Sequence, residues 1–441
     1  MSSQCVVVGG GPVGLATALL LAQAGHAVTV YEGEEEFPLS DANSYPIGVN
    51  PRGQETLRRI SPALLERVQR GSKVVAGWHV FAGRRQVAQL RSGRVLSTTR
   101  AFVNRVLLEQ ARACAGIEVV TGHRLVGVDV VSRKLSFSTI SGVVEVDAAQ
   151  ARVFAADGVR SVAREALSEQ VEGFSPRVEP WGVRFRVLFS QVGAQAAGVD
   201  PSFHYVFGAK GVYAAALSTG VWCVSLTCVE GSPDEGLLMA EEASAENVAA
   251  LRRFVAEHAP QVAPLLVEQD YVDFFSRRSF SGAVVRCSRV HEGEWLVLLG
   301  DAAHGVIPPT GEGINAGLED ALKVTEVLGR GSVEAFAQYN AARVPDLEAL
   351  GVYASVLAEN VRSSDPVARV SGVVMRVLGQ VQSVCGFRGS QVEQRLFGPG
   401  AGVAPYREVI GPWIAHRERY YPRVYRLVEW LHRVLRCEAR G

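Results

Sequence analysis

The chain has 441 residues, which is more than one ordinary core accommodates, so about two or three domains are expected. Its 45 basic and 45 acidic residues cancel, which excludes a strong overall field for nucleic acid or an anionic membrane and favours a small-molecule partner. Seven scattered cysteines without paired spacing predict no metal site and a reducing, cytoplasmic compartment.

The first predicted elements form a β-α-β unit. Residues 5–8 are a short apolar run, residues 12–24 have a helical pattern, and residues 27–31 form a second strand-like run. The turn at residues 9–14, GGGPVG, fits G-x-G-x-x-G, and Glu32 follows at the spacing typical of a ribose-binding acid. These features predict a dinucleotide site at a helix N-terminus, with a tightly packing glycine turn as the alternative.

The middle of the chain predicts two further layers. A helix at 100–114 and β-rich sequence up to residue 154 indicate a small antiparallel layer added to a doubly wound domain. Asp157-Gly158 then follows a strand and precedes a helix that Asp157 could cap, although an ordinary Asp-Gly turn is the alternative. Alternating β-rich runs between about 175 and 287 predict a second, antiparallel domain.

Residues 295–299 return to the uniformly apolar strand type of a parallel sheet, and they lead into the stretch at 296–321, LVLLGDAAHGVIPPTGEGINAGLEDA. Asp301 ends that strand, where open α/β sheets bind ligands, and its carboxylate suits the hydroxyls of a polyol chain. Gly311 and Gly313 expose backbone N–H groups at a helix start, where a flat ring could bind. NAD has no use for a site this late in the chain, so the motif favours FAD.

Together these motifs resemble the FAD-dependent aromatic-ring monooxygenases, the group A flavoprotein hydroxylases, and are most similar to kynurenine monooxygenase. The resemblance covers about residues 4–346 and rests on the glycine turn, on Asp157-Gly158, on Gly300-Asp301 and on the run at 95–108. It implies an α/β fold: a Rossmann-type FAD-binding domain of the p-hydroxybenzoate hydroxylase type, an antiparallel β-sheet substrate domain of α+β type, and C-terminal helices. The predicted boundaries are 1–72, 97–174 and 288–345 for the FAD-binding domain, 73–96 and 175–287 for the substrate domain, and 346–441 for the C-terminal helical region.

The resemblance also implies roles for individual residues. Arg100 and Leu125 would contact the FAD nucleotide, and Ile314 with Asn315 would contact the flavin pyrimidine edge. Arg52 falls where the family has an arginine near the flavin. The full predicted cofactor-binding set is Gly9, Gly11, Val13, Gly14, Glu32, Arg52, Arg100, Leu125, Asp157, Asp301, Pro308, Gly311, Gly313, Ile314 and Asn315.

The implied reaction is reduction of FAD by NADH or NADPH, addition of O2 to give a C4a-hydroperoxyflavin, and hydroxylation or epoxidation of an aromatic small molecule. The flavin carries this chemistry, so no catalytic residue is assigned. An FAD-dependent reductase or oxidase, or a flavin scaffold without oxygen insertion, is the alternative. A flavin halogenase is disfavoured because the six tryptophans never fall two apart, as its W-x-W motif requires.

The chain departs from its nearest relative where kynurenine would bind. That relative clamps the substrate carboxylate with an arginine, a tyrosine and an asparagine, and no arginine stands at 76–79. Arg84 is the nearest candidate, Tyr406 could supply the tyrosine, and Pro309-Thr310 replaces two phenylalanines. These four residues are the predicted substrate contacts. A different compound, related to kynurenine, tryptophan or indole and belonging to secondary metabolism, is therefore predicted.

The end of the chain has an apolar stripe interleaved with arginines. The stripe consists of Val424, Leu427, Val428, Leu431 and Leu435. We expect a helix that closes over the substrate domain, with attachment to a membrane surface as the alternative. The sequence does not distinguish a monomer from a homodimer.

Overall fold

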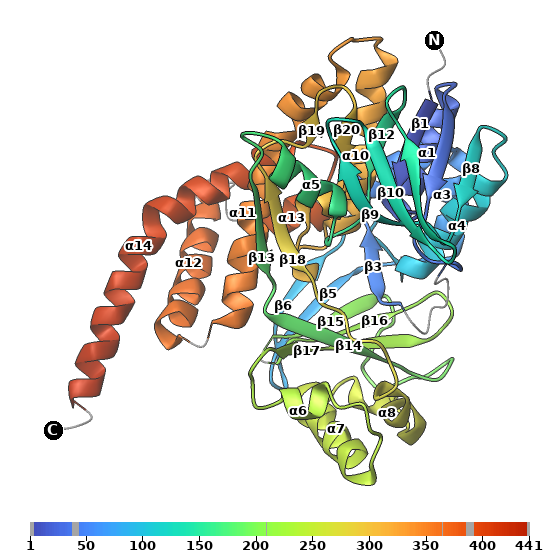
Figure 1. Cartoon of the computed structure of the whole chain (residues 1–441). Helices are drawn as coiled ribbons and strands as arrows, with labels where there is room; N and C mark the ends of the chain where they lie inside the picture. Colours follow the sequence, from blue (N-terminus) through green and yellow to red (C-terminus); the bar gives the residue numbers. More distant parts are fainter. Residues whose placement is uncertain (1–3, 38–43, 209, 364, 385–391, 439–441) are drawn as a thin grey trace.

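The computed structural model describes residues 4–37, 44–208, 210–363, 365–384 and 392–438. Two six-stranded sheets dominate the molecule, and a group of long helices lies to one side of both (Figure 1). The α/β fold with a second, antiparallel sheet domain and C-terminal helices is as predicted. The exact domain boundaries stay predictions.

The first sheet has the order β19-β20-β12-β1-β2-β8, and all pairings except β19 with β20 are parallel. Its strands are β1 (Gln4–Val8), β2 (Ala27–Tyr31), β8 (Ile117–Val120), β12 (Arg152–Ala155), β19 (His291–Glu292) and β20 (Leu296–Leu298). The late strand β20 pairs with β12, which confirms that the sheet resumes after a long insertion. The helices α1 (Pro12–Gln23), α4 (Arg100–Arg112) and α10 (Gly313–Gly329) pack together beside this sheet.

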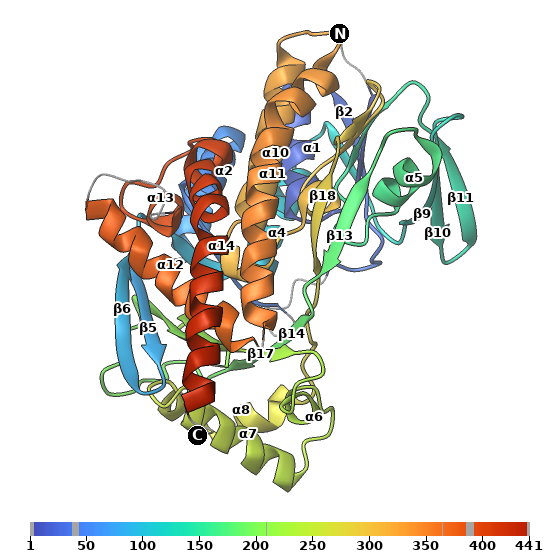
Figure 2. The ribbon, with the colours of Figure 1, turned by 90° about the vertical axis from the view of Figure 1, so that its left-hand side faces the viewer.

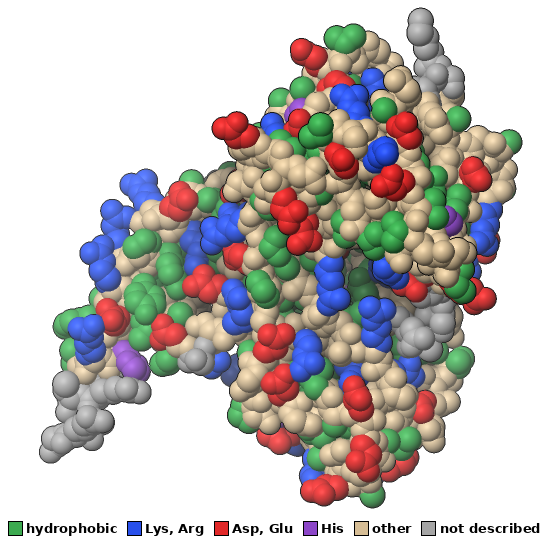
Figure 3. All heavy atoms as spheres, viewed as in Figure 1, with side chains coloured by type: hydrophobic (Ala, Val, Ile, Leu, Met, Phe, Trp, Pro, Cys, Tyr) green, Lys and Arg blue, Asp and Glu red, His purple; other side chains and the backbone are tan. Residues whose placement is uncertain are grey.

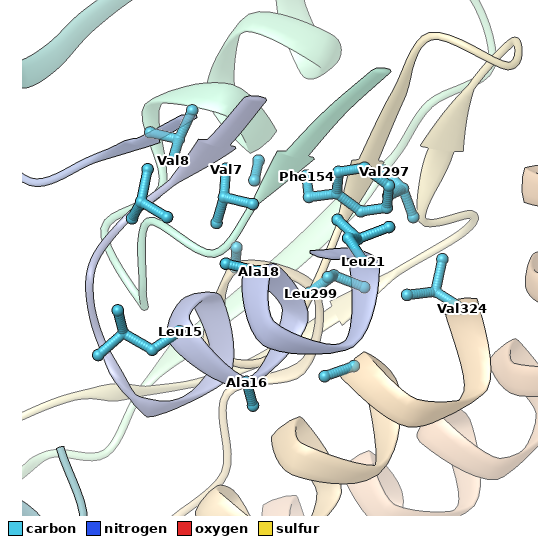
Figure 4. Close-up of a cluster of buried hydrophobic side chains, with 14 of the residues drawn as sticks. Val7, Val8, Leu15, Ala16, Ala18, Leu21, Phe154, Val297, Leu299 and Val324 are labelled. Carbon is cyan, nitrogen blue, oxygen red and sulfur yellow. The ribbon is translucent and has the colours of Figure 1, made fainter. Parts of the chain in front are cut away.

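Figure 4 shows why the sequences of these strands are uniformly apolar. Val7, Phe154 and Val297 come from three neighbouring strands and lie over Ala18 and Leu21 of α1. All five side chains are buried, because helices and flanking layers leave no solvent-facing side along these strands. A three-stranded layer stands beside the sheet, formed by β9 (Arg124–Asp129), β10 (Lys134–Thr139) and β11 (Gly142–Asp147), and β9 contacts α5 (Val162–Gln170).

The second sheet has the order β14-β17-β16-β15-β5-β6. Its strands are β5 (Gly77–Ala82), β6 (Arg85–Arg91), β14 (Val183–Phe189), β15 (Phe203–Phe207), β16 (Val212–Ala216) and β17 (Trp222–Val229). One face packs on a layer of short helices, namely α6 (Glu235–Leu238), α7 (Ala245–His258), η2 (Ala263–Leu265) and α8 (Glu268–Phe274). The other face looks toward the first sheet (Figure 1).

Shorter elements connect the two sheets. An antiparallel ribbon of β13 (Pro176–Pro180) and β18 (Ala283–Cys287) runs between them, clearly visible in Figure 1. A small sheet of order β3-β7-β4 lies at the junction, with strands β3 (Pro46–Val49), β4 (Lys73–Val74) and β7 (Leu96–Thr99). Four more short elements complete this part, namely α2 (Pro51–Ile60), α3 (Pro62–Arg70), α9 (Asp301–His304) and η3 (Pro308–Thr310).

The C-terminal region consists of α11 (Ala335–Arg362), α12 (Pro366–Val384), α13 (Val392–Phe397) and α14 (Tyr406–Glu438). Helix α14 packs on α11 and α12, and its C-terminal half projects away from the second sheet (Figures 1 and 2). The prediction that this helix closes over the substrate domain is therefore wrong. Leu427 and Leu431 of the predicted stripe are exposed, in a lobe where hydrophobic and arginine side chains mix (Figure 3). Among the described residues, no helix has the length and hydropathy needed to cross a bilayer.

Candidate cofactor and substrate site

The glycine turn after β1 has the backbone geometry that the motif predicts. Gly9 has a φ of +101°, and a Cβ there would lie 2.4 Å from the carbonyl oxygen of Ala156. A Cβ on Gly14 would lie 1.9 Å from the carbonyl oxygen of Gly9. Gly11 is the N-cap of α1 and offers no side-chain acceptor, which leaves the first N–H groups of the helix available to a ligand. Only glycine fits these positions without moving the backbone.

Glu32 is fixed at the end of β2 by two backbone groups. Its Oε2 accepts a hydrogen bond from the N–H of Gly10 at 2.7 Å, and its Oε1 accepts one from the N–H of Glu34 at 2.9 Å. The start of β9 lies alongside, because the N–H of His123 donates to the carbonyl of Glu32 at 2.8 Å. Leu125 of the same strand is buried in the main core. Glu32 therefore presents a carboxylate at the glycine turn, while Leu125 supports the wall beside it.

Arg100 lies over the glycine turn from the start of α4. Its Nη2 is 3.4 Å from the point where a Cβ on Gly11 would stand, and its side chain is exposed. Thr99 caps α4 by accepting a hydrogen bond from the N–H of Phe102 at 3.0 Å, which fixes where the arginine begins. The guanidinium also acts electrostatically on Asp301. The structure thus brings together three segments that lie far apart in the sequence.

Two carboxylates follow neighbouring parallel strands. Asp157 follows β12 and accepts a hydrogen bond from the N–H of Ala163 at 3.1 Å, as a cap of α5. Asp301 follows β20, and its side chain is exposed. The Asp301 side chain is therefore accessible to a ligand at the carboxyl end of β20. Desolvation by the surrounding protein raises the pKa of Asp301, while the charges of His304 and Arg100 act to lower it. Burial likewise raises the pKa of Asp157.

The loop before α10 contains the predicted residues Pro308, Pro309 and Thr310, which differ in exposure. Pro308 and Pro309 are exposed, whereas Thr310 is buried and donates a hydrogen bond to the carbonyl of Ile307 at 2.8 Å. Gly311 has a φ of +64°, and a Cβ there would lie 2.9 Å from the ring of Phe397. The predicted substrate residue Thr310 therefore contributes no free side chain, while Pro309 does.

Helix α10 starts at Gly313, so the N–H groups of Gly313, Ile314 and Asn315 have no intrahelical acceptor. The side chain of Asn315 is fully used inside the protein. Its Oδ1 accepts a hydrogen bond from the N–H of Asn50 at 3.0 Å, and its Nδ2 donates to the carbonyls of Gly48 at 2.9 Å and Gly311 at 2.8 Å. A ligand at this helix end would therefore meet backbone donors rather than the Asn315 amide.

A cluster of buried charges lies behind the loop, on α2, α10 and α11. Arg52 forms an ion pair with Glu319. Arg343 donates to Glu319 at 2.6 Å and to Asp320 at 2.7 Å. Asp320 also pairs with His304, and although burial opposes ionisation, His304 and Arg343 lower its pKa to about 2. Every member is more than nine-tenths buried, so each charge depends on its partners.

Glu312 is a functional candidate that the sequence interpretation missed. It is fully buried between Gly311 and Gly313, its Oε1 accepts a hydrogen bond from Nδ2 of Asn50 at 2.8 Å, and its Oε2 accepts one from the hydroxyl of Tyr406. Burial raises its pKa to about 7, although Arg52 and the Tyr406 hydrogen bond act in the opposite direction. The sequence did contain a signal for this role, because Glu312 is a glutamate between two glycines at the start of a predicted helix.

The two remaining substrate predictions have different outcomes. Tyr406 lies next to the loop before α10, as expected, but it is fully buried. Its hydroxyl donates a hydrogen bond to Glu312, and the guanidinium of Arg52 stacks 4.0 Å from its ring centre. Arg84 is exposed in the turn between β5 and β6, and its carbonyl accepts a hydrogen bond from Gln261, in the helical layer on the far face of the second sheet. The structure therefore separates Arg84 from the other predicted residues.

The residues at the C-terminal edge of the first sheet fit FAD. A Cβ on Gly10 would lie 2.7 Å from the ring of Phe37 and 2.9 Å from Oε2 of Glu32, and one on Gly11 would lie 3.4 Å from Nη2 of Arg100, so the glycine turn lies directly against both charged side chains. A carboxylate and a guanidinium at a glycine turn suit a ribose and a pyrophosphate, and the accessible carboxylate of Asp301 suits a polyol chain. Among the described residues, no group of histidine, cysteine or carboxylate side chains could hold a metal ion.

Comparisons with known proteins agree with this geometry. Residues 2–350 match the FAD binding domain family. A kynurenine 3-monooxygenase of Neurospora crassa is 26% identical over 389 residues, which cover 78% of this chain and 75% of that protein. Two solved structures share the fold: a tetrameric 2-methyl-3-hydroxypyridine-5-carboxylic acid oxygenase (TM-score 0.65, 19% identity, 82% and 93% covered) and a p-nitrophenol 4-monooxygenase from Pseudomonas putida (TM-score 0.63, 21% identity, 84% and 91% covered).

Proposed function

The chain belongs to the family of FAD-dependent aromatic monooxygenases, and from that premise we propose that it uses NADH or NADPH and O2 to hydroxylate or epoxidise a small aromatic compound. The observation that carries the proposal is the convergence of the glycine turn, Arg100 and Asp301 at the carboxyl edge of the first sheet. Nη2 of Arg100 lies 3.4 Å from the Cβ position of Gly11, the guanidinium acts electrostatically on Asp301, and a Cβ on Gly300, next to Asp301, would lie 3.0 Å from Val13 of α1. A reductase or oxidase that inserts no oxygen remains the alternative.

In this proposal, bound FAD supplies the acceptance of a hydride and the activation of oxygen. Arg100 and the N-terminus of α1 would bind the pyrophosphate, and Glu32 would bind the ribose. Asp301 would bind hydroxyls of the ribityl chain. The N-terminus of α10 would stabilise negative charge on the flavin ring through the N–H groups of Ile314 and Asn315.

We propose a substrate other than kynurenine, related to kynurenine, tryptophan or indole and belonging to secondary metabolism. Curated relatives at 25–26% identity are named kynurenine 3-monooxygenase, which supports an aromatic substrate of this kind. Two groups that could clamp a carboxylate, Arg52 and Tyr406, instead bind Glu319 and Glu312. A substrate carboxylate at that place would meet an internal carboxylate rather than a free cation, which is unfavourable in a buried site.

The test is turnover of the FAD-loaded protein under 18O2 with NADPH or NADH and a panel of indoles, quinolones and kynurenine. We expect one 18O atom in the product and one nicotinamide oxidised for each product formed. Nicotinamide oxidation that yields hydrogen peroxide with every aromatic compound, and never an oxygenated product, would support the reductase or oxidase instead. Comparing KM for NADH and NADPH decides the preferred cosubstrate.

A further inference from the structure

The inner face of the second sheet, which looks toward the first sheet, carries a hydrogen-bonded pair of ring side chains, His204 and Tyr213. Tyr205 and Phe207 of β15 pack in the core shared with α7 and α8, so the alternate residue His204 faces the other way. By the same alternation Tyr213 of β16 shares this inner face. Trp78 of β5 is paired in register with His204. Three strands therefore place these three rings together.

The three rings form a directed chain of hydrogen-bonding groups. The indole N–H of Trp78 acts on the phenol oxygen of Tyr213, and the hydroxyl of Tyr213 bonds to Nδ1 of His204. An indole N–H can only donate, so the phenol oxygen accepts from Trp78; among the described residues Nδ1 is the one acceptor within reach of the phenol proton, so Tyr213 donates to Nδ1. The proton of the neutral imidazole then belongs on Nε2. The structure assigns a donor, not an acceptor, to the far side of His204.

That donor is unsatisfied within the described chain. Nε2 of His204 is buried without a hydrogen-bond partner, and the residue is 4% exposed. Burial lowers the pKa of His204 to about 3 and raises that of Tyr213 well above its ordinary value, so both groups are uncharged at neutral pH. Buried donors are normally paired in folded proteins, so an unpaired one indicates a partner that binds from outside the chain.

Contacts between aromatic rings connect His204 and Tyr213 to the loop before α10. The ring centres of Trp78 and His204 are 6.0 Å apart, and Trp78 is also 6.0 Å from Phe397. Phe397 in turn packs on Gly311, where a Cβ would come within 2.9 Å of its ring. Trp78 and Tyr213 keep part of their surface accessible although protein surrounds Tyr213. An aromatic wall with a polar end thus extends from the loop before α10.

We propose that Trp78, Tyr213 and His204 orient the substrate, by stacking on its ring and by donating the Nε2–H hydrogen bond of His204 to an uncharged carbonyl or hydroxyl oxygen. The proposal rests on the proposed function and narrows its substrate class to oxygen-bearing, uncharged heteroaromatic compounds or aryl ketones. A neutral donor matches such an oxygen, whereas a carboxylate here would lose its water beside two uncharged partners, Tyr213 and His204. These are positioning residues, and no proton or electron transfer is assigned to them.

The test measures the dissociation constants of the FAD-loaded protein for three matched pairs: 4-quinolone and quinoline, oxindole and indole, and 2-aminoacetophenone and 2-ethylaniline. Perturbation of the flavin absorbance reports binding without turnover. In the wild type, the oxygen-bearing member of at least one pair should bind about tenfold more tightly. Tyr213→Phe and His204→Leu should remove that preference, with FAD content and the affinity for the deoxy member changed less than twofold.

Tyr205→Phe is the matched control, because it removes a hydroxyl from the opposite face of the same sheet, where that group bonds to the backbone of Asp200. It should leave the preference intact. Equal loss of affinity for both members of a pair, or no preference in the wild type for any pair, would overturn the inference. The proposed function is judged separately, by 18O incorporation in the wild type, which can succeed while this inference fails.

Discussion

Two buried polar regions of this molecule differ in how far the chain satisfies them. Around α10, Arg52 and Arg343 pair with Glu319 and Asp320, so their charges are matched within the protein. On the inner face of the second sheet, Nε2 of His204 has no partner among the described residues. The contrast is that the charges of the first region are balanced by the chain itself, whereas in the second region the proposed substrate would supply the missing partner of an uncharged group. Substitutions should therefore affect stability in the first and binding in the second.

The largest effect is expected from Arg343→Met. The change leaves Glu319 and Asp320 buried with fewer counter-charges, and breaking such a pair typically costs about 3–5 kcal/mol of unfolding free energy. Denaturant unfolding measures the loss. The surface pair of Arg67 with Glu109 provides the control, because Arg67→Met should cost at most about 1 kcal/mol. Similar losses in both variants would remove the distinction between the buried cluster and an ordinary surface.

The pH dependence of stability tests Glu312 within the same cluster. Its pKa is about 7 in the folded protein, against an ordinary value of 4.5, so between these values the folded state holds a proton that the unfolded state has released. The stability of the wild type should therefore fall by up to about 3 kcal/mol as the pH rises through this window. Glu312→Gln lacks the group, so its stability relative to the wild type should rise from about pH 4.5 and level off above about pH 7.

The exposed Glu66→Gln is the control for this profile, because Glu66 lies on the surface of α3. Its stability should follow the wild type at each pH. A constant difference between Glu312→Gln and the wild type from pH 4.5 to pH 8 would show that Glu312 holds no proton in that range, and would place it with the permanently charged members of the cluster.

Substitution of Asp301 tests whether a residue at the carboxyl edge of the first sheet affects FAD binding rather than stability. The Asp301 side chain is exposed at the carboxyl end of β20, so Asp301→Ala should weaken FAD binding about tenfold or more while changing unfolding free energy by less than about 1 kcal/mol. Quenching of flavin fluorescence on titration of the apoprotein measures the affinity. Glu169→Ala removes an exposed carboxylate of α5 that makes no hydrogen bond or ion pair with the described residues, and it should leave both quantities unchanged. A stability loss without any change in FAD affinity would assign Asp301 to the folded framework instead.

The smallest effect is expected for the double variant His204→Leu with Tyr213→Phe. Replacing both partners of a buried hydrogen bond by apolar groups is often close to neutral, so the loss should stay within about 1 kcal/mol. Denaturant unfolding of the FAD-loaded protein provides the measurement. A loss as large as that of Arg343→Met would show that this pair supports the fold in the way the charged cluster does, and the two regions would no longer differ in kind.

The sequence allowed much of the fold to be predicted, because local patterns carried the information. The glycine turn requires a positive φ at Gly9 and a close approach at Gly14, and no other residue meets both needs. The return of the first sheet at β20 could be predicted from its uniformly apolar strand. The course of α14 could not, since an apolar stripe does not specify whether it faces another domain or solvent.

The sequence by itself determined the glycine turn after β1 and the position of Glu32 after β2, because their spacing along one strand, turn and helix is local. Only the tertiary structure decided which polar side chains are paired inside the protein and which are left for a ligand. It brought Arg52, Tyr406 and Glu312 together across more than 350 positions, and so converted a predicted substrate contact into an internal hydrogen bond. It also placed His204 beside Tyr213 with an unpaired N–H. Both outcomes depend on which polar groups meet in the folded core, and no sequence spacing encodes that pairing.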